Sequence, residues 1–371
     1  MTPDWAPAFT AVPRAPFLPD LMWAHDLDTN SNMPVSRADD PETWLAYAEA
    51  DVPIVTQWDD GDHTGTGPGR LSTSSASMPS LVLSMLKDLD VQPGHKVLEI
   101  GTGTGWNAAL LAHRAGADNV ITMEVDKAVA ASARAALRRF GAAVEVVTGD
   151  GFLGHPQGAP YDRVIATAGL RTVPYTWVEQ TRPGGAIVAP WGTHYSNRDA
   201  VARLTVSSDG TSASGPFTRP AQFMKLRDQR LKWSGHSALV PQDVIGNSDQ
   251  TTTTLTEEEF SSGLFDAAPF AVGLRVRDCR NSPARKRDGT RPVWFYGLSD
   301  RSWAVVIFQD GAAENTVYQS GSRRLWDESE AAYRWWEEQG KPGYDRFGLT
   351  VDPEGHKAWL DTPANVLAPV S

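Results

Sequence analysis

The chain has 371 residues, which is enough for two or three domains with full hydrophobic cores. Its formal net charge of -11 disfavours non-specific binding to nucleic acid or anionic membranes, and its single cysteine excludes an internal disulfide and a cysteine metal cluster. The N-terminus lacks a basic segment followed by an apolar run, and no stretch approaches the roughly 18 uncharged apolar residues of a membrane helix. We therefore expect a cytoplasmic protein with no metal, nucleic-acid or membrane partner.

Composition and the pattern of strand and helix signals divide the chain into three regions, and we predict domains over residues 1–50, 51–228 and 229–371. The first region is rich in Pro, Asp and Trp, with one predicted helix over residues 41–49. Strand and helix signals alternate in the second, with strands at 96–100, 120–125, 144–147, 161–166 and 186–189, and helices at 82–89, 106–114, 127–140 and 173–181. This alternation indicates βαβ units and a parallel sheet, whose ligands bind beyond the carboxyl ends of the strands.

The third region has a different pattern, with the threonine run 251–254, short β-rich segments and many tryptophans. We predict a strand over residues 303–308. A helix is predicted over 327–339, where Asp327 and Glu330 have the spacing of a capping pair and Gly340 follows as a terminator. Most of the tryptophans are expected to be core residues rather than a binding surface.

A glycine loop, Gly101-Thr102-Gly103-Thr104-Gly105, follows the first strand of the middle region. Glycines allow the backbone to turn sharply and to approach a ligand closely, although a plain turn would also fit. One residue separates the second and third glycines, where the dinucleotide fingerprint has two, so the loop does not indicate a dehydrogenase. An acidic residue, Glu99, stands just before it.

Two further carboxylates follow the next two strands. Glu124 ends the second strand about 20 residues after the glycine loop, where nucleotide-binding sheets place an acceptor for ribose hydroxyls. Asp150-Gly151 follows the third strand, and an Asp there can accept from an adenine amine, although Asp-Gly alone is typical of a plain turn. Because the three features fall at successive strand ends, together they predict a site for an adenosyl cofactor.

Specific motifs extend this pattern: residues 97–109 (VLEIGTGTGWNAA), 149–152 (GDGF), 159–165 (APYDRVI), 166–168 (ATA) leading to Val173-Pro174, and 182–185 (RPGG). On these blocks, residues 70–228 resemble the protein-L-isoaspartate O-methyltransferase family. The resemblance implies an α/β fold, with a Rossmann-like class I methyltransferase sheet and a smaller α+β C-terminal domain. It also implies S-adenosyl-L-methionine as cofactor, S-adenosyl-L-homocysteine as product, and a peptide or protein substrate bearing Asp or isoaspartate. The implied cofactor-binding residues are Glu99, Gly101, Thr102, Gly103, Gly105, Glu124, Asp150 and Gly151.

The same resemblance assigns the acceptor side to residues 75–80. It implies that the Ser77 hydroxyl lies beside the methyl acceptor as the catalytic group, with Ser75, Pro79 and Ser80 binding substrate. The alternative is that Ser77 only caps a helix containing Pro79. The family's usual Gln-Thr is absent here, and Ser80 stands where repair enzymes commonly have His. These departures put the acceptor pocket of a repair enzyme in doubt.

About 140 residues follow the point where a typical repair enzyme of this family would end. Similar methyltransferases with such a tail occur with ribosomally made peptides, including graspetides and lanthipeptides. This implies methylation of an Asp in a macrocyclic precursor, leading to succinimide (aspartimide) or isoaspartate, with residues 229–371 as an accessory substrate-recognition domain. The alternatives are an isoaspartate repair methyltransferase and an inactive cofactor-binding interaction module.

The tail also contains a basic stretch, which consists of Arg275, Arg277, Arg280, Arg285, Lys286, Arg287 and Arg291. Turn signals at Asn281-Ser282-Pro283 and Asp288-Gly289 favour a solvated loop. The functional alternative is a patch that attracts an acidic peptide to the mouth of the site.

Overall fold

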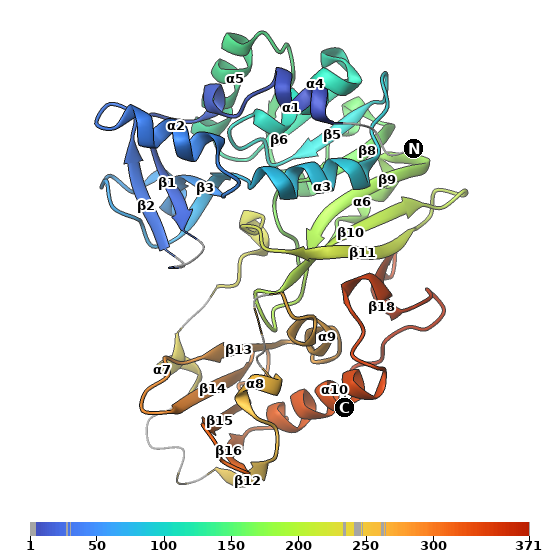
Figure 1. Ribbon diagram of the computed structural model, residues 1–371. Helices are drawn as coiled ribbons and strands as arrows, with labels where there is room; N and C mark the ends of the chain where they lie inside the picture. Colours follow the sequence, from blue (N-terminus) through green and yellow to red (C-terminus); the bar gives the residue numbers. More distant parts are fainter. Residues whose placement is uncertain are drawn as a thin grey trace.

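The computed structural model describes residues 5–370, except residues 27, 28, 30, 233, 234, 241–245, 247, 261, 262 and 264. Figure 1 shows an α/β half with a small sheet at its side and a second, C-terminal sheet below it. Among the described residues, none of the helices is long and apolar enough to span a bilayer.

A nine-stranded sheet forms the centre, in the order β18-β17-β11-β10-β9-β8-β5-β6-β7. Strands β5 to β9 pair in parallel and the remaining neighbours pair antiparallel. The bounds are β5 (Val97–Ile100), β6 (Val120–Glu124), β7 (Glu145–Thr148), β8 (Tyr161–Ala166), β9 (Thr181–Trp191), β10 (Asp199–Val206), β11 (Ala213–Ala221), β17 (Phe347–Asp352) and β18 (Gly355–Leu360). The predicted parallel α/β core is therefore confirmed.

Both faces of this sheet are buried, because successive residues of a strand point to opposite sides. Val97 of β5 packs in one apolar cluster and Leu98 in another. The first cluster joins the sheet to α1 (Ala6–Ala11), α3 (Pro79–Leu89), α4 (Trp106–Ala115) and α5 (Lys127–Phe140). The second joins it to α6 (Tyr175–Glu179), α9 (Ala268–Arg275) and much of the C-terminal region.

Local sequence explains the helix ends that matter for the site. Asp126 caps α5 by accepting from the backbone N–H groups of Ala128 and Val129, and Gly141 ends it in a left-handed conformation. The predicted helix over 173–181 is shorter, because β9 already begins at Thr181. The Pro183-Gly184-Gly185 segment of the RPGG motif lies within that strand.

A four-stranded sheet in the order β2-β1-β3-β4 adjoins the core. Its strands are β1 (Leu21–Asp26), β2 (Ser31–Ser36), β3 (Ile54–Trp58) and β4 (Ser72–Ala76), and α2 (Pro41–Glu49) confirms the helix predicted there. Because β1 pairs with β3, one sheet spans the predicted domain boundary at residue 50.

The C-terminal region contains a five-stranded antiparallel sheet in the order β12-β16-β15-β14-β13. Its elements are α7 (His236–Leu239), β12 (Asp249–Thr253), α8 (Glu257–Phe260), β13 (Cys279–Pro283), β14 (Thr290–Gly297), β15 (Trp303–Gln309), β16 (Asn315–Ser320) and α10 (Leu325–Glu338). The predicted capping pair of α10 is wrong. Arg324 is the N-cap residue, Asp327 accepts from the Gln319 amide, and Glu330 accepts from the Trp326 indole.

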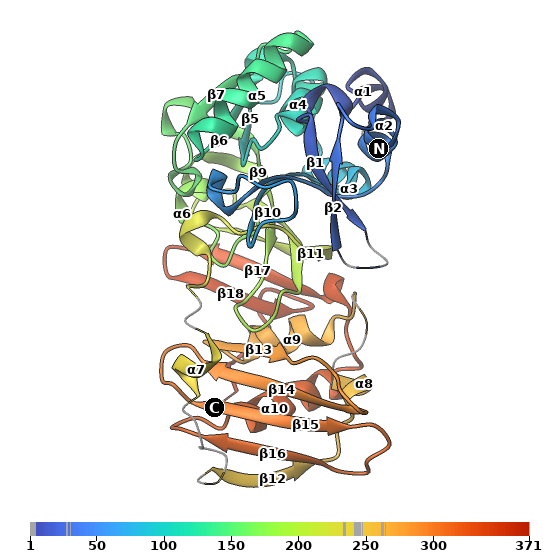
Figure 2. The same cartoon turned by 90° about the vertical axis from the view of Figure 1, so that its left-hand side faces the viewer.

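The chain then returns to the central sheet across the predicted boundary at residue 228. Strand β17 pairs with β11, and Figure 2 shows β17 and β18 lying between the other strands of the central sheet and the five-stranded sheet. The backbone N–H of Val173 donates to His356 of β18 over 3.1 Å. Several tryptophans of the tail are core residues, as expected, including Trp303, Trp326, Trp336 and Trp359.

Short 3₁₀ helices complete the description: η1 (Ala15–Phe17), η2 (Asp59–Gly61), η3 (Ala117–Asn119), η4 (Gly151–Leu153), η5 (Pro156–Gly158), η6 (Arg227–Gln229) and η8 (Tyr344–Arg346).

Candidate active site

A cavity of about 850 Å³ lies at the carboxyl ends of the parallel strands. Its wall combines segments far apart in sequence: residues 72–78, 100–104, 123–125, 150–152, 167–168, 197–199 and 220–231, with Arg171, His194, Phe265, Arg280 and Tyr344. This is where open α/β sheets place their ligands.

The glycine loop forms the floor of the cavity. Gly101 and Gly103 have φ angles of 95° and 52°, which glycine adopts without steric cost. A Cβ on Gly103 would stand 3.3 Å from the Ser75 carbonyl oxygen, so a side chain there would crowd the acceptor segment. The Thr167 hydroxyl donates to the Gly101 carbonyl over 2.5 Å, which ties the loop to the end of β8.

Glu124 and Asp150 line the same cavity, as the sequence predicts for residues at these strand ends. One Glu124 carboxylate oxygen accepts from the Gly103 N–H over 3.0 Å, and the other from the Asp126 N–H over 3.1 Å. Burial raises the pKa of Glu124, although these two hydrogen bonds oppose the rise. The exposed Asp150 accepts from the Phe152 N–H over 2.9 Å.

Two predicted cofactor residues do not line the cavity. The Glu99 carboxylate is fully buried on the α4 side of the sheet, where it accepts from Asn107 and Thr122 over 2.7 and 2.5 Å. Gly105 is the N-cap residue of α4, and a Cβ there would stand 3.2 Å from Leu137 of α5. Both residues support the loop from behind, whereas Gly101, Thr102, Gly103 and Gly151 line the cavity.

Ser75 and Ser77 line the acceptor side of the cavity, but Pro79 and Ser80 do not. Ser80 is exposed, and its N–H donates to Asp51 over 2.8 Å. Helix α3 begins after Met78 as N-cap, without a side-chain cap bond, so the alternative that Ser77 is the helix cap is wrong.

Arg14 fixes the backbone at Ser77. Its side chain is 5% exposed, and one of its terminal nitrogens donates to the Ser77 carbonyl over 3.2 Å. Its remaining hydrogen bonds go to the carbonyls of Tyr47, Ala48, Ala50 and Val52. The N-terminal region thereby becomes part of the acceptor site, which the sequence did not indicate.

A basic cluster, which we define as Arg171, Arg198, Lys225 and Arg280, lines the cavity beyond Ser77. Asp199 is fully buried beside it and pairs with Arg171 over 2.6 Å and with Lys225. Burial lowers the pKa of Lys225, and the Asp199 carboxylate opposes this shift. Of this cluster, only Arg280 could be suspected from the sequence, because the other three residues lie in no recognisable motif.

The connection after β11, residues 222–231, covers one side of the cavity, and we call it the strap. Its backbone exchanges hydrogen bonds with Gly169, through Met224 and Leu226. Arg227 pairs with Asp126 over 2.6 Å and with Asp60 over 3.1 Å. The strap therefore links the cofactor side of the cavity to the N-terminal sheet.

The basic stretch predicted in the tail does not form one patch. Arg280 alone among its members lines the cavity. Lys286 pairs with Glu257 and Asp310, and Arg291 also pairs with Glu257. Arg275 stacks on Trp335, with its guanidinium carbon 4.6 Å from the ring centroid.

Residues 46–229 match the model of the protein-L-isoaspartate(D-aspartate) O-methyltransferase family. A protein-L-isoaspartate O-methyltransferase from Hyperthermus butylicus is 39% identical over 192 residues, which cover 49% of this chain and 72% of that protein. The chain belongs to the protein-L-isoaspartate O-methyltransferase family.

Two further relatives agree with this assignment. The family member from Thermococcus onnurineus is 34% identical over 47% of this chain and 80% of its own. The member from Methanopyrus kandleri is 45% identical, over 40% of this chain, and the match spans only 61% of that protein's length.

A solved protein-L-isoaspartate O-methyltransferase matches 97% of this chain and 96% of its own, with a TM-score of 0.52 and 23% identity. At this identity the likeness shows the fold alone. Because the match covers nearly the whole chain, the likeness in fold includes the C-terminal region.

Proposed function

We propose that the protein is an S-adenosylmethionine-dependent O-methyltransferase that esterifies an aspartyl-type carboxylate in a peptide. The observation that carries this proposal is the shared cavity: the cofactor residues Glu124 and Asp150 and the acceptor residue Ser77 line one continuous wall. An inactive cofactor-binding module would not need the acceptor side.

The residues fit the cofactor. Gly103 has no side chain to fill the space beside Ser75, Glu124 offers a carboxylate to the ribose hydroxyls, and Asp150 can accept from the adenine amine. The cofactor, when bound, supplies an electrophilic methyl group on a sulfonium.

The side chains of the site need to supply little chemistry of their own. An aspartyl carboxylate has a reference pKa near 4, so it is ionised at pH 7 and needs no general base. Ser77 can donate a hydrogen bond to one of its oxygens and aim the other at the methyl group, while the strap limits the access of water. Alignment is therefore the contribution expected of these residues.

For the acceptor, we propose a macrocyclic ribosomal peptide precursor, with the ester leading to a succinimide or isoaspartate. The altered segment at Ser74-Ser75, which lines the cavity, supports it, as does a cavity wall that includes Phe265, Arg280 and Tyr344 of the C-terminal region. The second candidate, repair of isoaspartyl proteins, is favoured by the names of the matched relatives.

Mass spectrometry of a peptide panel tests this proposal. Ordinary aspartyl, isoaspartyl and macrocyclic Asp peptides are incubated with enzyme and S-adenosylmethionine. We expect a gain of one methyl group, or loss of water through the succinimide, on the macrocyclic peptide first. Exclusive methylation of the isoaspartyl peptide would establish the repair candidate, and no modification of any peptide would contradict both.

A further inference from the structure

The cavity has two chemically different ends. Its cofactor residues follow β5, β6 and β7, whereas Arg171 follows β8 and Arg198 directly precedes β10. In the strand order β10-β9-β8-β5-β6-β7, the strands next to the two arginines form one half and the strands of the cofactor residues form the other. The basic cluster therefore lies on the acceptor side.

The acceptor end is positively charged in a protein of net charge -11. The cluster has four cationic groups, and Asp199 is the buried carboxylate that two of them share. Of the other acidic residues that line the cavity, Glu124 and Asp150 lie at the cofactor end and Asp228 lies in the strap. Cations held in a partly buried wall attract an anionic ligand, because water screens them poorly.

The pKa of a neighbouring histidine, His194, reflects the positive charge of this cluster. The pKa of His194 is lowered, first by burial and then by Arg171 and Arg280, while Asp278 acts in the opposite direction. This supports the geometry, in which cations from the central sheet and from the C-terminal region face one space.

We propose that the basic cluster binds a second carboxylate of the acceptor peptide, and that Arg280 of β13 is the residue that selects it. The inference rests on the proposed function and adds the substrate class: a peptide with an acidic group beside the methylated residue. Guanidinium groups suit this role because they bind a carboxylate through two parallel hydrogen bonds.

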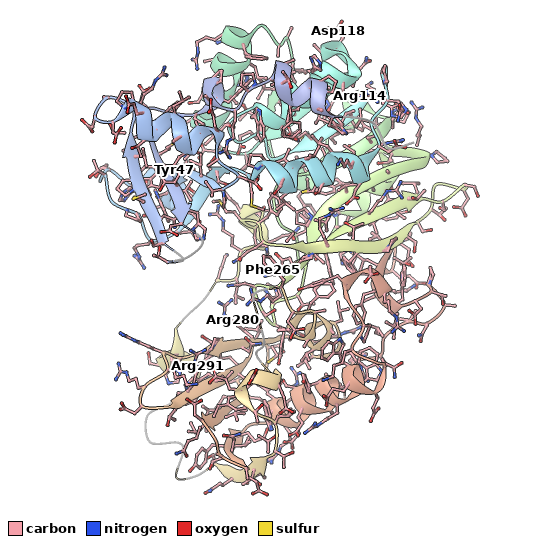
Figure 3. The ribbon with its side chains drawn as sticks, in the orientation of Figure 1. Tyr47, Arg114, Asp118, Phe265, Arg280 and Arg291 are labelled. Atoms are coloured by element: carbon pink, nitrogen blue, oxygen red, sulfur yellow. The ribbon has the colours of Figure 1, made fainter. Side chains whose placement is uncertain are left out.

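An exposed aromatic side chain indicates a peptide rather than a small free acid. Phe265 also lines the cavity, yet 71% of its surface is exposed. Figure 3 shows Phe265 and Arg280 near each other where the C-terminal region meets the methyltransferase half, whereas Arg291 lies farther out. A ring beside a cation can pack against the residues that flank an acidic side chain.

Paired peptides test the proposal. Two isoaspartyl hexapeptides, identical except for Glu or Gln directly after the acceptor, are titrated calorimetrically into enzyme saturated with S-adenosylhomocysteine. We expect the wild type to bind the Glu peptide about tenfold more tightly, the order expected of a charge-assisted hydrogen bond. Arg280→Gln should reduce this ratio towards one, and Arg280→Lys should retain part of it.

The matched control is Arg285→Gln, an exposed arginine that follows the same strand and does not line the cavity. It should keep the wild-type ratio. Equal binding of both peptides by the wild type, or an unchanged ratio in Arg280→Gln, would overturn the proposal. Because binding requires no turnover, a preserved preference together with no methylation of any peptide in the panel would refute the proposed function and leave the carboxylate subsite standing.

Discussion

Glu124 is the residue on which cofactor recognition most depends. It contacts the glycine loop directly and lines the cavity, so its carboxylate is placed for a charge-assisted hydrogen bond to a ribose. We expect Glu124→Ala to lose about 1.5–3 kcal/mol of binding, or roughly ten- to 150-fold in Kd for S-adenosylmethionine. Calorimetry measures this, with Asp118→Ala as a control on an exposed residue outside the cavity. An unchanged Kd would refute the ribose assignment.

Ser77 is the residue on the acceptor side whose replacement should affect turnover rather than cofactor binding. Since its hydroxyl aims the acceptor and does not hold the cofactor, Ser77→Ala should lower kcat about tenfold or more, with cofactor affinity nearly intact. Steady-state kinetics and calorimetry on the same sample measure both quantities. Ser80→Ala, three residues away and outside the cavity, should behave as wild type. Full activity in Ser77→Ala would show that the hydroxyl has no catalytic role.

Glu99 gives a prediction about pH and stability. Burial raises its pKa from 4.5 to about 7, although the hydrogen bonds from Thr122 and Asn107 oppose the rise. The unfolded chain releases this proton at lower pH than the folded one. The stability that Glu99 contributes is therefore complete below about pH 4.5 and is lost as the pH rises through 7.

Chemical denaturation at several pH values measures the effect. Relative to Glu99→Gln, the free energy of unfolding of the wild type should fall between pH 4.5 and 7, by an amount on the order of 2 kcal/mol. Only the pH dependence of the difference is diagnostic, because the amide also changes the hydrogen bonds. A constant difference across this window would mean that Glu99 titrates normally.

At the scale of elements, the strap connects both ends of the site. Arg227 of the strap forms ion pairs with Asp126 and with Asp60 of η2. Asp126 is the N-cap residue of α5 and follows β6, the strand that ends at Glu124. These side chains are partly exposed, so each ion pair is expected to contribute about 0.2–1 kcal/mol. Arg227→Met should then speed cofactor release about two- to fivefold, as measured by stopped-flow displacement.

The control for this variant is Arg182→Met, which removes the ion pair with Asp162 and lies outside the cavity wall. It should leave the release rate unchanged. Identical release from Arg227→Met and wild type would show that the strap closes without this ion pair.

The elements near the glycine loop were predictable because their signals are local. A short apolar strand, the loop and a capped helix lie within a few residues of one another, and Glu124 and Asp150 follow from the strand ends alone. Arg14, Asp199 and Lys225 were not predictable, since each acts through partners many residues away. Pro79 and Ser80 were assigned by motif, but the cavity wall includes Met78, Leu81 and Val82 of this segment and not these two residues.

At the scale of the whole molecule, strands from distant segments pair across the domain boundaries that composition suggests. Strand β1 pairs with β3 across residue 50, and β17 returns from the tail to pair with β11. Consequently α9 and the five-stranded sheet share a core with the methyltransferase strands, and the tail contributes Arg280 to the cavity. No local sequence pattern indicates that β17 pairs with β11.

The chemical nature of the product tests the central claim most directly. The enzyme is incubated with the peptide panel and S-adenosylmethionine carrying a labelled methyl group, and the peptides are then made alkaline. A carboxyl methyl ester is base-labile, so we expect the label to appear on the peptide and to leave as volatile methanol, with one S-adenosylhomocysteine formed per methyl transferred. Label that stays on the peptide in base, or cofactor binding without any transfer, would contradict it.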